Sequence, residues 1–201
     1  MKTRRTPLIW GAIGLLGLTF LDQLTKYLAS HYLAGTSGIQ LIPGVFELYY
    51  LENKGAAFGM MTNRQWFFIL IAAVMTLLAV YVYVLLPSGR YYLSLRVVCL
   101  LIASGAVGNM IDRIFHNYVI DFLYFSLIDF PIFNVADCYV CIGAALTVLL
   151  IFTLYKEEKF AFLVPGRSAK NWEEFLFDKA QHKYGEAQKA NGNSNDDGSM
   201  A

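Results

Sequence analysis

Two aspartates, Asp121 and Asp137, stand among apolar residues in the second half of the chain and have asparagines nearby. Two carboxyl groups that lie close together cannot both ionise cheaply, so one keeps its proton while the other acts as a base. Such a pair can activate a water molecule and polarise an amide carbonyl. Carboxylates in membranes also conduct protons or ions, so a peptidase and an ion pathway remain equal alternatives on these residues alone. Asp129 is a third candidate carboxylate.

Three asparagines and an arginine accompany this pair in short polar clusters. Asn53, Asn109 and Asn134 carry side-chain amides, which can hold a peptide backbone or orient a carboxyl group without adding charge. Arg113 offers a rigid fork of donors suited to a carbonyl, a phosphate or a carboxylate. An ionisable group near hydrocarbon costs about 2.5–3.5 kcal/mol, so such groups tend to face an interior and to have a function. Each cluster ends an apolar stretch, and together they occupy residues 22–26, 53–58, 108–113, 119–122 and 134–137.

The remaining polar residues give little sign of other chemistry. Asp22 and Lys26 lie four residues apart, so an ion pair on one helix explains both. The pair Cys138-x-x-Cys141 has no second pair and no histidine beside it, and the three histidines have no ligand spacing. The signatures G-x-S-x-G and H-E-x-x-H are absent from the sequence. These residues therefore give only weak evidence for a zinc site and no sign of a serine hydrolase or a metalloprotease of those types.

The elements that position these residues are apolar enough to cross a membrane. Of the 201 residues, 57% are hydrophobic and only 15% are charged. A bilayer core of about 30 Å needs about 20 helical residues. The alternative is a soluble bundle of four buried helices, but helices that are apolar on all sides need a far larger protein to cover them. The sequence thus predicts an all-α membrane protein with four transmembrane helices, at about residues 7–29, 66–86, 91–111 and 138–155.

The distribution of charge predicts the orientation of these helices. Twelve of the 16 lysines and arginines precede the first span, flank the turn between the second and third, or follow the fourth. All seven acidic residues before residue 156 fall on the opposite side. Because basic loops stay in the cytoplasm, we expect both termini there and the polar clusters on the outer side of the membrane. The net charge of +1 gives no sign of nucleic-acid binding.

The segments outside the spans differ in composition. Residues Ile39 to Leu51 are rich in aromatic and β-branched side chains, which predicts a small β-sheet cradle on the outer membrane surface, with Asn53 to Phe58 returning toward the bilayer. A plain connector is the alternative. We expect a membrane domain over residues 1–155 and a cytoplasmic tail over residues 156–201. Within that tail a helix is expected at about 172–190, and the polar residues from 191 to 201 are expected to be disordered.

Five motifs in this order resemble those of the lipoprotein signal peptidases, or signal peptidases II, a family of bacterial enzymes. The resemblance runs from about Pro7 to Tyr155. A single motif is only suggestive, whereas all five on four spans are highly specific. The motifs that carry the resemblance are Asp22-Gln23-Leu24-Thr25-Lys26, Asn53-Lys54-Gly55-Ala56-Ala57-Phe58, Gly108-Asn109-Met110-Ile111-Asp112-Arg113, Val119-Ile120-Asp121-Phe122 and Asn134-Val135-Ala136-Asp137.

The resemblance implies an intramembrane aspartyl endopeptidase that needs no metal or organic cofactor. Its substrate would be a prolipoprotein whose cysteine already carries diacylglycerol, and the enzyme would cut just before that cysteine and release the signal peptide. By motif, Asp121 and Asp137 match the catalytic pair. Asp22 and Lys26 match the first-helix motif, where support of the site is the expected role. The positions that match the family's substrate pocket are Asn53, Gly55, Asn109, Arg113 and Asn134.

The same resemblance implies a multi-pass protein of the bacterial cytoplasmic (inner) membrane, with its active site on the periplasmic side. Its partners would be the diacylglyceryl prolipoprotein and membrane lipid, without nucleic acid, and we expect a monomer. Asp129 lies between the motifs and is better explained as a loop residue than as a third catalytic group. A structural membrane scaffold is a further alternative, but it leaves the five polar clusters unexplained.

Overall fold

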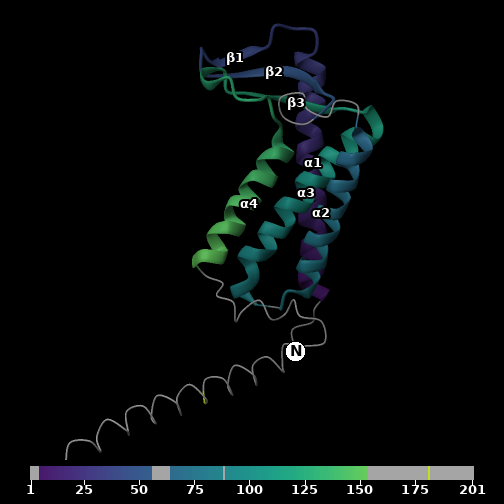
Figure 1. Ribbon diagram of the computed structural model, residues 1–201, viewed down its shortest axis with the longest axis vertical. Coiled ribbons are helices and arrows are strands. Elements are labelled where there is room, and N and C mark those ends of the chain that lie inside the picture. Colours follow the sequence, from purple (N-terminus) through teal and green to yellow (C-terminus); the bar gives the residue numbers. More distant parts are fainter. Residues whose placement is uncertain (1–4, 56–63, 88, 154–180, 182–201) are drawn as a thin grey trace, which may run out of the picture. The chain divides into compact units, whose positions relative to one another are not determined.

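Four long helices carry the apolar segments, and a small sheet lies at one end of them (Figure 1). The computed structural model describes residues 5–55, 64–87, 89–153 and 181. Each helix has the length and hydropathy needed to cross a membrane, which confirms the expected helical class with four candidate transmembrane helices. The helices are α1 (Arg5–Leu33), α2 (Gln65–Leu85), α3 (Leu93–His116) and α4 (Val135–Thr153).

Three of these helices extend beyond the apolar runs that predicted them, and α1 continues past residue 29 to Leu33. Helix α3 continues past Ile111 to His116, and α4 begins at Val135 rather than at Cys138. The additional turns of α3 and α4 carry Asp112, which is buried, and Arg113 and Asp137, which are partly buried, so hydropathy alone does not detect them. As a result, Asp137 lies in the first turn of α4. Helix α3 ends where Asn117 adopts a left-handed conformation with φ 63°, a common helix stop.

The sheet has three antiparallel strands in the order β1-β2-β3. The predicted stretch from Ile39 to Leu51 divides into a hairpin of β1 (Ile39–Ile42) and β2 (Phe46–Asn53), which confirms the expected sheet. The third strand, β3 (Val119–Tyr124), was not predicted, because pairing with β2 rather than its own pattern makes it a strand. This pairing places Asp121 opposite Leu51 near the end of β2.

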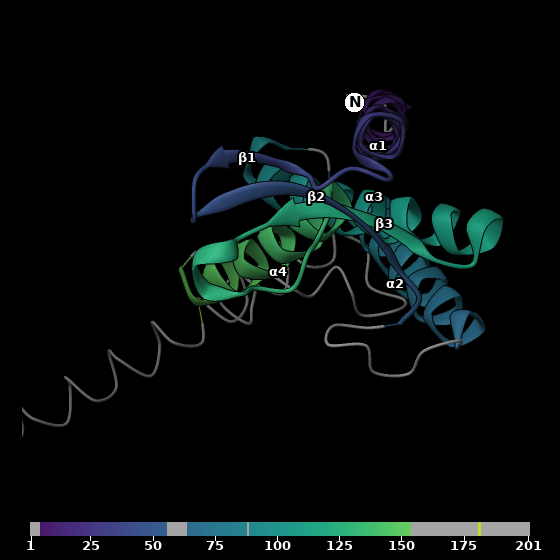
Figure 2. The same cartoon turned by 90° about the horizontal axis from the view of Figure 1, so that it is seen from above.

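Helix α3 is central to the bundle. It packs along α2 and α1, and seen from above it lies between them (Figure 2). Glycines allow α4 to approach it closely. A Cβ atom added at Gly105 of α3 would meet the backbone carbonyl of Ala136, and one added at Gly143 of α4 would meet Ile102 at 2.8 Å. The short 3-10 helices η2 (Arg90–Tyr92) and η3 (Ser126–Ile128) complete the described elements.

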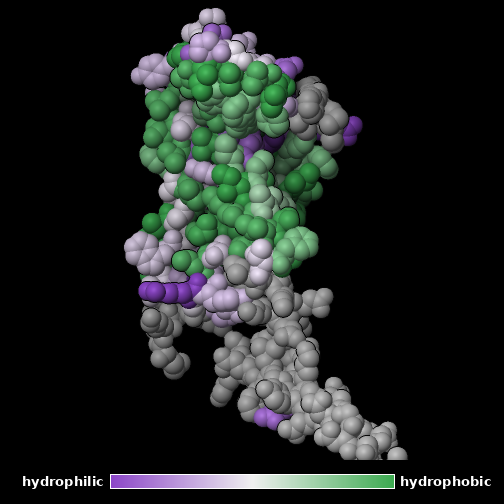
Figure 3. All heavy atoms as spheres, turned by 90° about the vertical axis from the view of Figure 1, so that its left-hand side faces the viewer, coloured by the Kyte–Doolittle hydropathy of each residue, from purple (hydrophilic) through white to green (hydrophobic). Residues whose placement is uncertain are grey.

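The outer faces of the helices are apolar. Large side chains such as Leu16, Phe20 and Leu77 are about two-thirds exposed, at 70%, 67% and 69%. Figure 3 shows hydrophobic side chains covering most of the visible helical face. A soluble protein would bury such a surface, whereas a bilayer provides it with hydrocarbon.

The chain divides into two units, Met1–Ile151 and Phe152–Ala201. The first contains the sheet and nearly all of the four helices. The helix expected at about 172–190 and the polar end from 191 to 201 lie outside the described residues, apart from Gln181. The same holds for residues 56–58, so their expected return toward the bilayer stays a prediction.

Candidate active site

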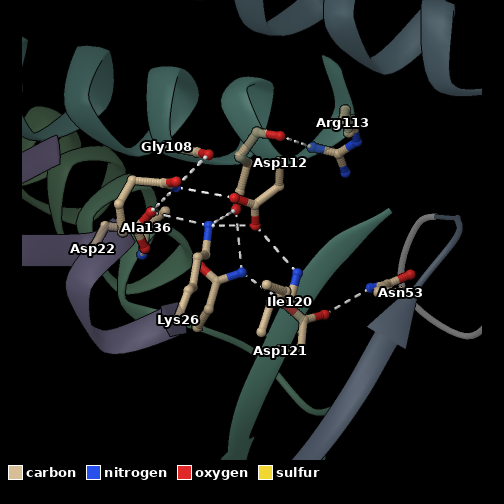
Figure 4. A network of polar contacts seen from close by, with 12 residues as sticks. Asp22, Lys26, Asn53, Gly108, Asp112, Arg113, Ile120, Asp121 and Ala136 are labelled. Atoms are coloured by element: carbon tan, nitrogen blue, oxygen red, sulfur yellow. Dashed lines mark hydrogen bonds and ion pairs between the residues drawn. The ribbon is translucent and has the colours of Figure 1, made fainter. Parts of the chain in front are cut away.

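Five polar side chains that the described residues bury almost completely gather where the helices meet the sheet. They belong to α1, α3, β3 and the turn that precedes α4, and they form one network of hydrogen bonds and ion pairs (Figure 4). None of the five is more than 2% exposed. They are Asp22, Lys26, Asp112, Asp121 and Asn134.

The centre of the network is the ammonium group of Lys26. Its Nζ atom lies 2.9 Å from Asp22 Oδ2 and 3.0 Å from Asp112 Oδ2. The ion pair expected between Asp22 and Lys26 is therefore present, and Asp112 joins it from α3. Gln23 donates from Nε2 to Asp112 Oδ1 at 2.9 Å and to the Gly108 carbonyl at 3.1 Å. Such buried charges are tolerated because they are paired and hydrogen-bonded.

The two carboxylates of this ion network also hold the backbone at two distant points of the chain. Asp112 Oδ2 accepts a hydrogen bond from the Ile120 backbone N–H at 3.1 Å. Asp22 Oδ1 accepts one from the Ala136 backbone N–H at 2.8 Å. Ile120 immediately precedes Asp121, and Ala136 immediately precedes Asp137. The ion network thus fixes the backbone next to both candidate catalytic aspartates.

Asn109 links the ion network to Asp137. Its Oδ1 atom accepts hydrogen bonds from Lys26 Nζ at 2.9 Å and from Asn134 Nδ2 at 3.1 Å. Because two donors face this oxygen, the amide nitrogen of Asn109 must point the other way. There it donates to Asp137 Oδ1 at 2.7 Å. Lys26 therefore determines which side of the Asn109 amide meets the Asp137 carboxyl group.

Asp121 lies buried in β3 between two amide donors. Asn53 Nδ2 donates to Oδ2 at 2.8 Å, and Asn134 Nδ2 donates to Oδ1 at 2.6 Å. Burial raises the pKa of Asp121 from an ordinary value of 3.8 to about 7, and the nearby charge of Asp137 contributes to this rise. The two amide hydrogen bonds lower the pKa and so limit the rise. At neutral pH this carboxyl group can therefore exist in either protonation state.

Asp137 has a different environment, at the start of α4 and only partly buried. Its Oδ2 atom accepts a hydrogen bond from the Asn134 backbone N–H at 3.1 Å, and its own N–H donates to Asn134 Oδ1 at 3.0 Å. This reciprocal pair is a capping box, and the helix N-terminus favours a negative charge at this position. Asn134 contacts both aspartates, so the two carboxyl groups belong to one site.

Of the other predicted residues, Gly55 and Arg113 lie next to the site, and Asp129 lies outside it. Gly55 is buried and donates from its backbone N–H to Asn53 Oδ1 at 3.0 Å. Arg113 donates to the Asn109 carbonyl at 3.3 Å, and its guanidinium lies 5.0 Å from the centroid of the Phe68 ring. Asp129 is exposed and accepts a hydrogen bond from the Tyr124 hydroxyl at 2.7 Å, outside the network.

Sequence reasoning did not include Asp112 and Gln23 among the site residues. Both are in the motifs, and Asp112 shares a helical face with Asn109, so spacing was an available signal. Their partners lie on other elements, which a local pattern does not reveal. Within the part of the chain that the structure describes, no group of three or more His, Cys, Asp or Glu side chains is arranged to hold a metal ion.

Four candidate membrane-crossing helices with a carboxyl pair held by amides at one end define a membrane protein with an acidic polar site. The family model described as signal peptidase (SPase) II matches residues 15–153, and the chain belongs to that family. It is thus an aspartic-type signal peptidase of bacterial membranes, from a family that removes signal peptides from lipoprotein precursors.

Relatives and solved structures agree with this assignment. Lipoprotein signal peptidases of two Streptococcus pyogenes strains, serotype M5 (Manfredo) and serotype M18 (MGAS8232), are each 39% identical over 148 residues, which cover 74% of this chain and 94% of theirs. A bacterial membrane enzyme solved by the in meso method at 2.3 Å resolution is 30% identical, with a TM-score of 0.63, over 73% of this chain and 92% of its own. A second, at 1.9 Å, is 28% identical with the same TM-score, over 72% and 94%.

The ion network makes a prediction about stability. Lys26→Met leaves the carboxylates of Asp22 and Asp112 buried without their cation, so we expect the free energy of unfolding to fall by about 3–5 kcal/mol. Lys54→Met is the matched control at an exposed lysine, with an expected change within about 0.5 kcal/mol. Unfolding in detergent micelles measures both. Equal stability of the two variants would contradict the role of Lys26.

Proposed function

We propose that this chain is an intramembrane aspartyl endopeptidase that cuts diacylglyceryl-modified prolipoproteins just before the lipidated cysteine, with Asp121 and Asp137 as the catalytic pair. One observation carries the assignment of the pair. Asn134 donates from its side chain to Asp121 and from its backbone to Asp137, so a single residue joins the two carboxyl groups. Family membership supports the substrate class.

The different environments of the two aspartates suggest different roles. Asp121 is buried with a raised pKa, which favours the protonated form, whereas Asp137 lies at a helix N-terminus, which favours the carboxylate. In the proposed reaction Asp137 removes a proton from water while the water oxygen adds to the scissile carbonyl, which the Asp121 proton polarises. A proton then passes to the leaving cysteine nitrogen, and the C–N bond breaks. The products are a signal-peptide carboxyl group and a free amine.

The amides and the arginine have supporting roles in this proposal. Asn53, Asn109 and Asn134 orient the carboxyl groups by the hydrogen bonds described above, and Gly55 orients Asn53. Arg113 has a buried Nε atom with no hydrogen-bond partner among the described residues. The guanidinium group as a whole is only partly buried, and its planar fork of donors suits a carbonyl of the precursor peptide or of its lipid ester.

The distribution of polar groups favours hydrolysis over a proton or ion pathway. The carboxylates of the described helices, Asp22, Asp112 and Asp137, all lie in the network next to the sheet. Farther along the helices, toward the N-terminus of α1, the bundle contains a cavity of about 200 Å³. Its walls are largely apolar and include Leu15, Leu100 and Ala103. A chain of proton-carrying carboxylates therefore does not continue through the described part of the bundle.

The proposed orientation places the network at the periplasmic surface and both termini in the cytoplasm, with residues 1–155 as the membrane domain and 156–201 as a cytoplasmic tail. The excess of basic residues in the segments assigned to the cytoplasm supports it. Topology reporters fused to the N-terminus and to the C-terminus should both report a cytoplasmic location. A periplasmic signal from either fusion would contradict the orientation.

Removal of either catalytic carboxyl group tests the pair. Asp121→Asn and Asp137→Asn should each reduce cleavage of a diacylglyceryl precursor by at least about 10²–10⁴-fold, because proton transfer to and from the reacting groups is lost. Asp129→Asn is the matched control and should retain most of the activity, since that carboxylate is exposed and outside the network. Mass spectrometry of the released signal peptide measures the rate and locates the cut. Retained cleavage in either of the first two variants would refute the assignment.

The raised pKa of Asp121 predicts a pH dependence. Below pH 7 the group keeps its proton, and above pH 7 the pair loses the proton that polarises the carbonyl. The cleavage rate should therefore fall as pH rises through about 7. Asn53→Leu removes a hydrogen bond that favours the carboxylate form of Asp121, so the pKa of Asp121 should rise. The alkaline limb of the pH–rate profile, where the cleavage rate falls, should then move up by about one pH unit. Initial rates across the pH range measure the limb, and a downward shift would contradict the proposed role of Asp121.

A further inference from the structure

The two amides that donate to Asp121 are held in place by different means. Asn134 is fixed by the capping box of α4 and by Asn109, so its own orientation follows from the helices. Asn53 is the last residue of β2, where the strand pairing ends. Its backbone is paired with Val119, and the orientation of its side-chain amide depends on the turn that follows the strand.

The backbone turn that follows Asn53 has a contact with α2. Asn53 Oδ1 accepts the Gly55 backbone N–H at 3.0 Å, so the orientation of the Asn53 amide depends on the path of residues 53–55. Between them lies Lys54, whose carbonyl oxygen accepts a hydrogen bond from Gln65 Nε2 at 2.8 Å. Gln65 is the first residue of α2, and its side chain is only 8% exposed. It thus connects the turn to a helix that packs along α3.

The buried side-chain amide of Gln65 has a hydrogen-bond partner at only one of its two polar atoms. Its Oε1 atom is buried and has no hydrogen-bond partner among the described residues, an unfavourable state for a polar atom. Rotating the amide would turn Oε1 toward the Lys54 carbonyl oxygen, and two acceptors repel each other, so the observed orientation is required. The one hydrogen bond of the Gln65 amide therefore holds the Lys54 carbonyl oxygen. Through that carbonyl it holds the turn that orients Asn53.

We propose that Gln65 is a positioning residue for hydrolysis: by holding the Lys54 carbonyl, it keeps the Asn53 amide hydrogen-bonded to the carboxyl group of Asp121. This inference rests on the proposed function of Asp121. Gln65 touches neither Asp121 nor the reacting atoms in this scheme. Its effect passes through the backbone of Lys54 to Asn53, and from there to the protonation of the carboxyl group.

The test is the pH profile of the full-length enzyme in detergent or vesicles with a diacylglyceryl precursor peptide. Gln65→Met keeps the size of the side chain but removes its donor. We expect the alkaline limb to move to higher pH, in the same direction as in Asn53→Leu and by no more than that variant's shift of about one unit. The double variant Asn53→Leu/Gln65→Met should show the shift of Asn53→Leu alone, because both changes remove the same hydrogen bond.

Control variants separate this effect from a loss of stability. Gln40→Leu changes an exposed glutamine of β1 that bonds Glu47 at 3.4 Å, and it should leave the limb in place. A variant that merely unfolds part of the protein lowers the amount of active enzyme without moving the limb. Should Gln65→Met fail to fold, Gln65→Asn serves instead, because a shorter amide suits a helix start but is too short to hold the Lys54 carbonyl as Gln65 does.

Each outcome bears on the inference. An unchanged limb in folded Gln65→Met or Gln65→Asn, or shifts that add fully in the double variant, would overturn it. Those results leave the proposed function intact, provided that Asp121→Asn still abolishes cleavage and Asn53→Leu still shifts the limb. Cleavage by Asp121→Asn would instead refute the proposed catalytic role of Asp121, whatever the Gln65 variants show.

Discussion

The buried ammonium group of Lys26, between the carboxylates of Asp22 and Asp112, is the constraint on which the arrangement of the site depends. In surroundings of low polarity an unpaired charge is very costly, so these groups must stay together. The spare acceptor sites of the two carboxylates hold the backbones of β3 and α4, one residue before each candidate catalytic aspartate. A single charge cluster in this way sets the positions of α1, α3, β3 and α4 relative to one another.

Amides then connect this cluster to the two proposed catalytic aspartates without adding charge. Asn109 receives a hydrogen bond from Lys26 and gives one to Asp137, and Asn134 contacts both aspartates. Because the amides are neutral, the two carboxyl groups can differ through their surroundings alone. Burial raises the pKa of Asp121, while Asp137 stands at a helix N-terminus. In the proposed mechanism, that difference lets Asp121 keep the proton while Asp137 acts as the base.

Much of this architecture could be predicted from the sequence, and the failures have a common cause. Long apolar runs located the four helices, and the aromatic segment from Ile39 to Leu51 located the hairpin. The predicted spans stopped short of the polar end of α3 and the polar start of α4. The polar side chains there form hydrogen bonds within the protein, so these turns do not have to be apolar. Strand β3 was missed because its pairing partner, β2, lies far away in the sequence.

The sequence by itself determined which residues are out of place in hydrocarbon, and hence the candidate site, since a polar group in an apolar run is a local property. Only the tertiary structure decided how they meet: that Asp112 completes the charge cluster, that Asn134 joins the aspartates, and that Gln65 reaches the Lys54 carbonyl. Hydrogen bonds and ion pairs depend on distances of about 3 Å between atoms from separate elements. Spacing along one chain cannot specify those distances until the elements have packed.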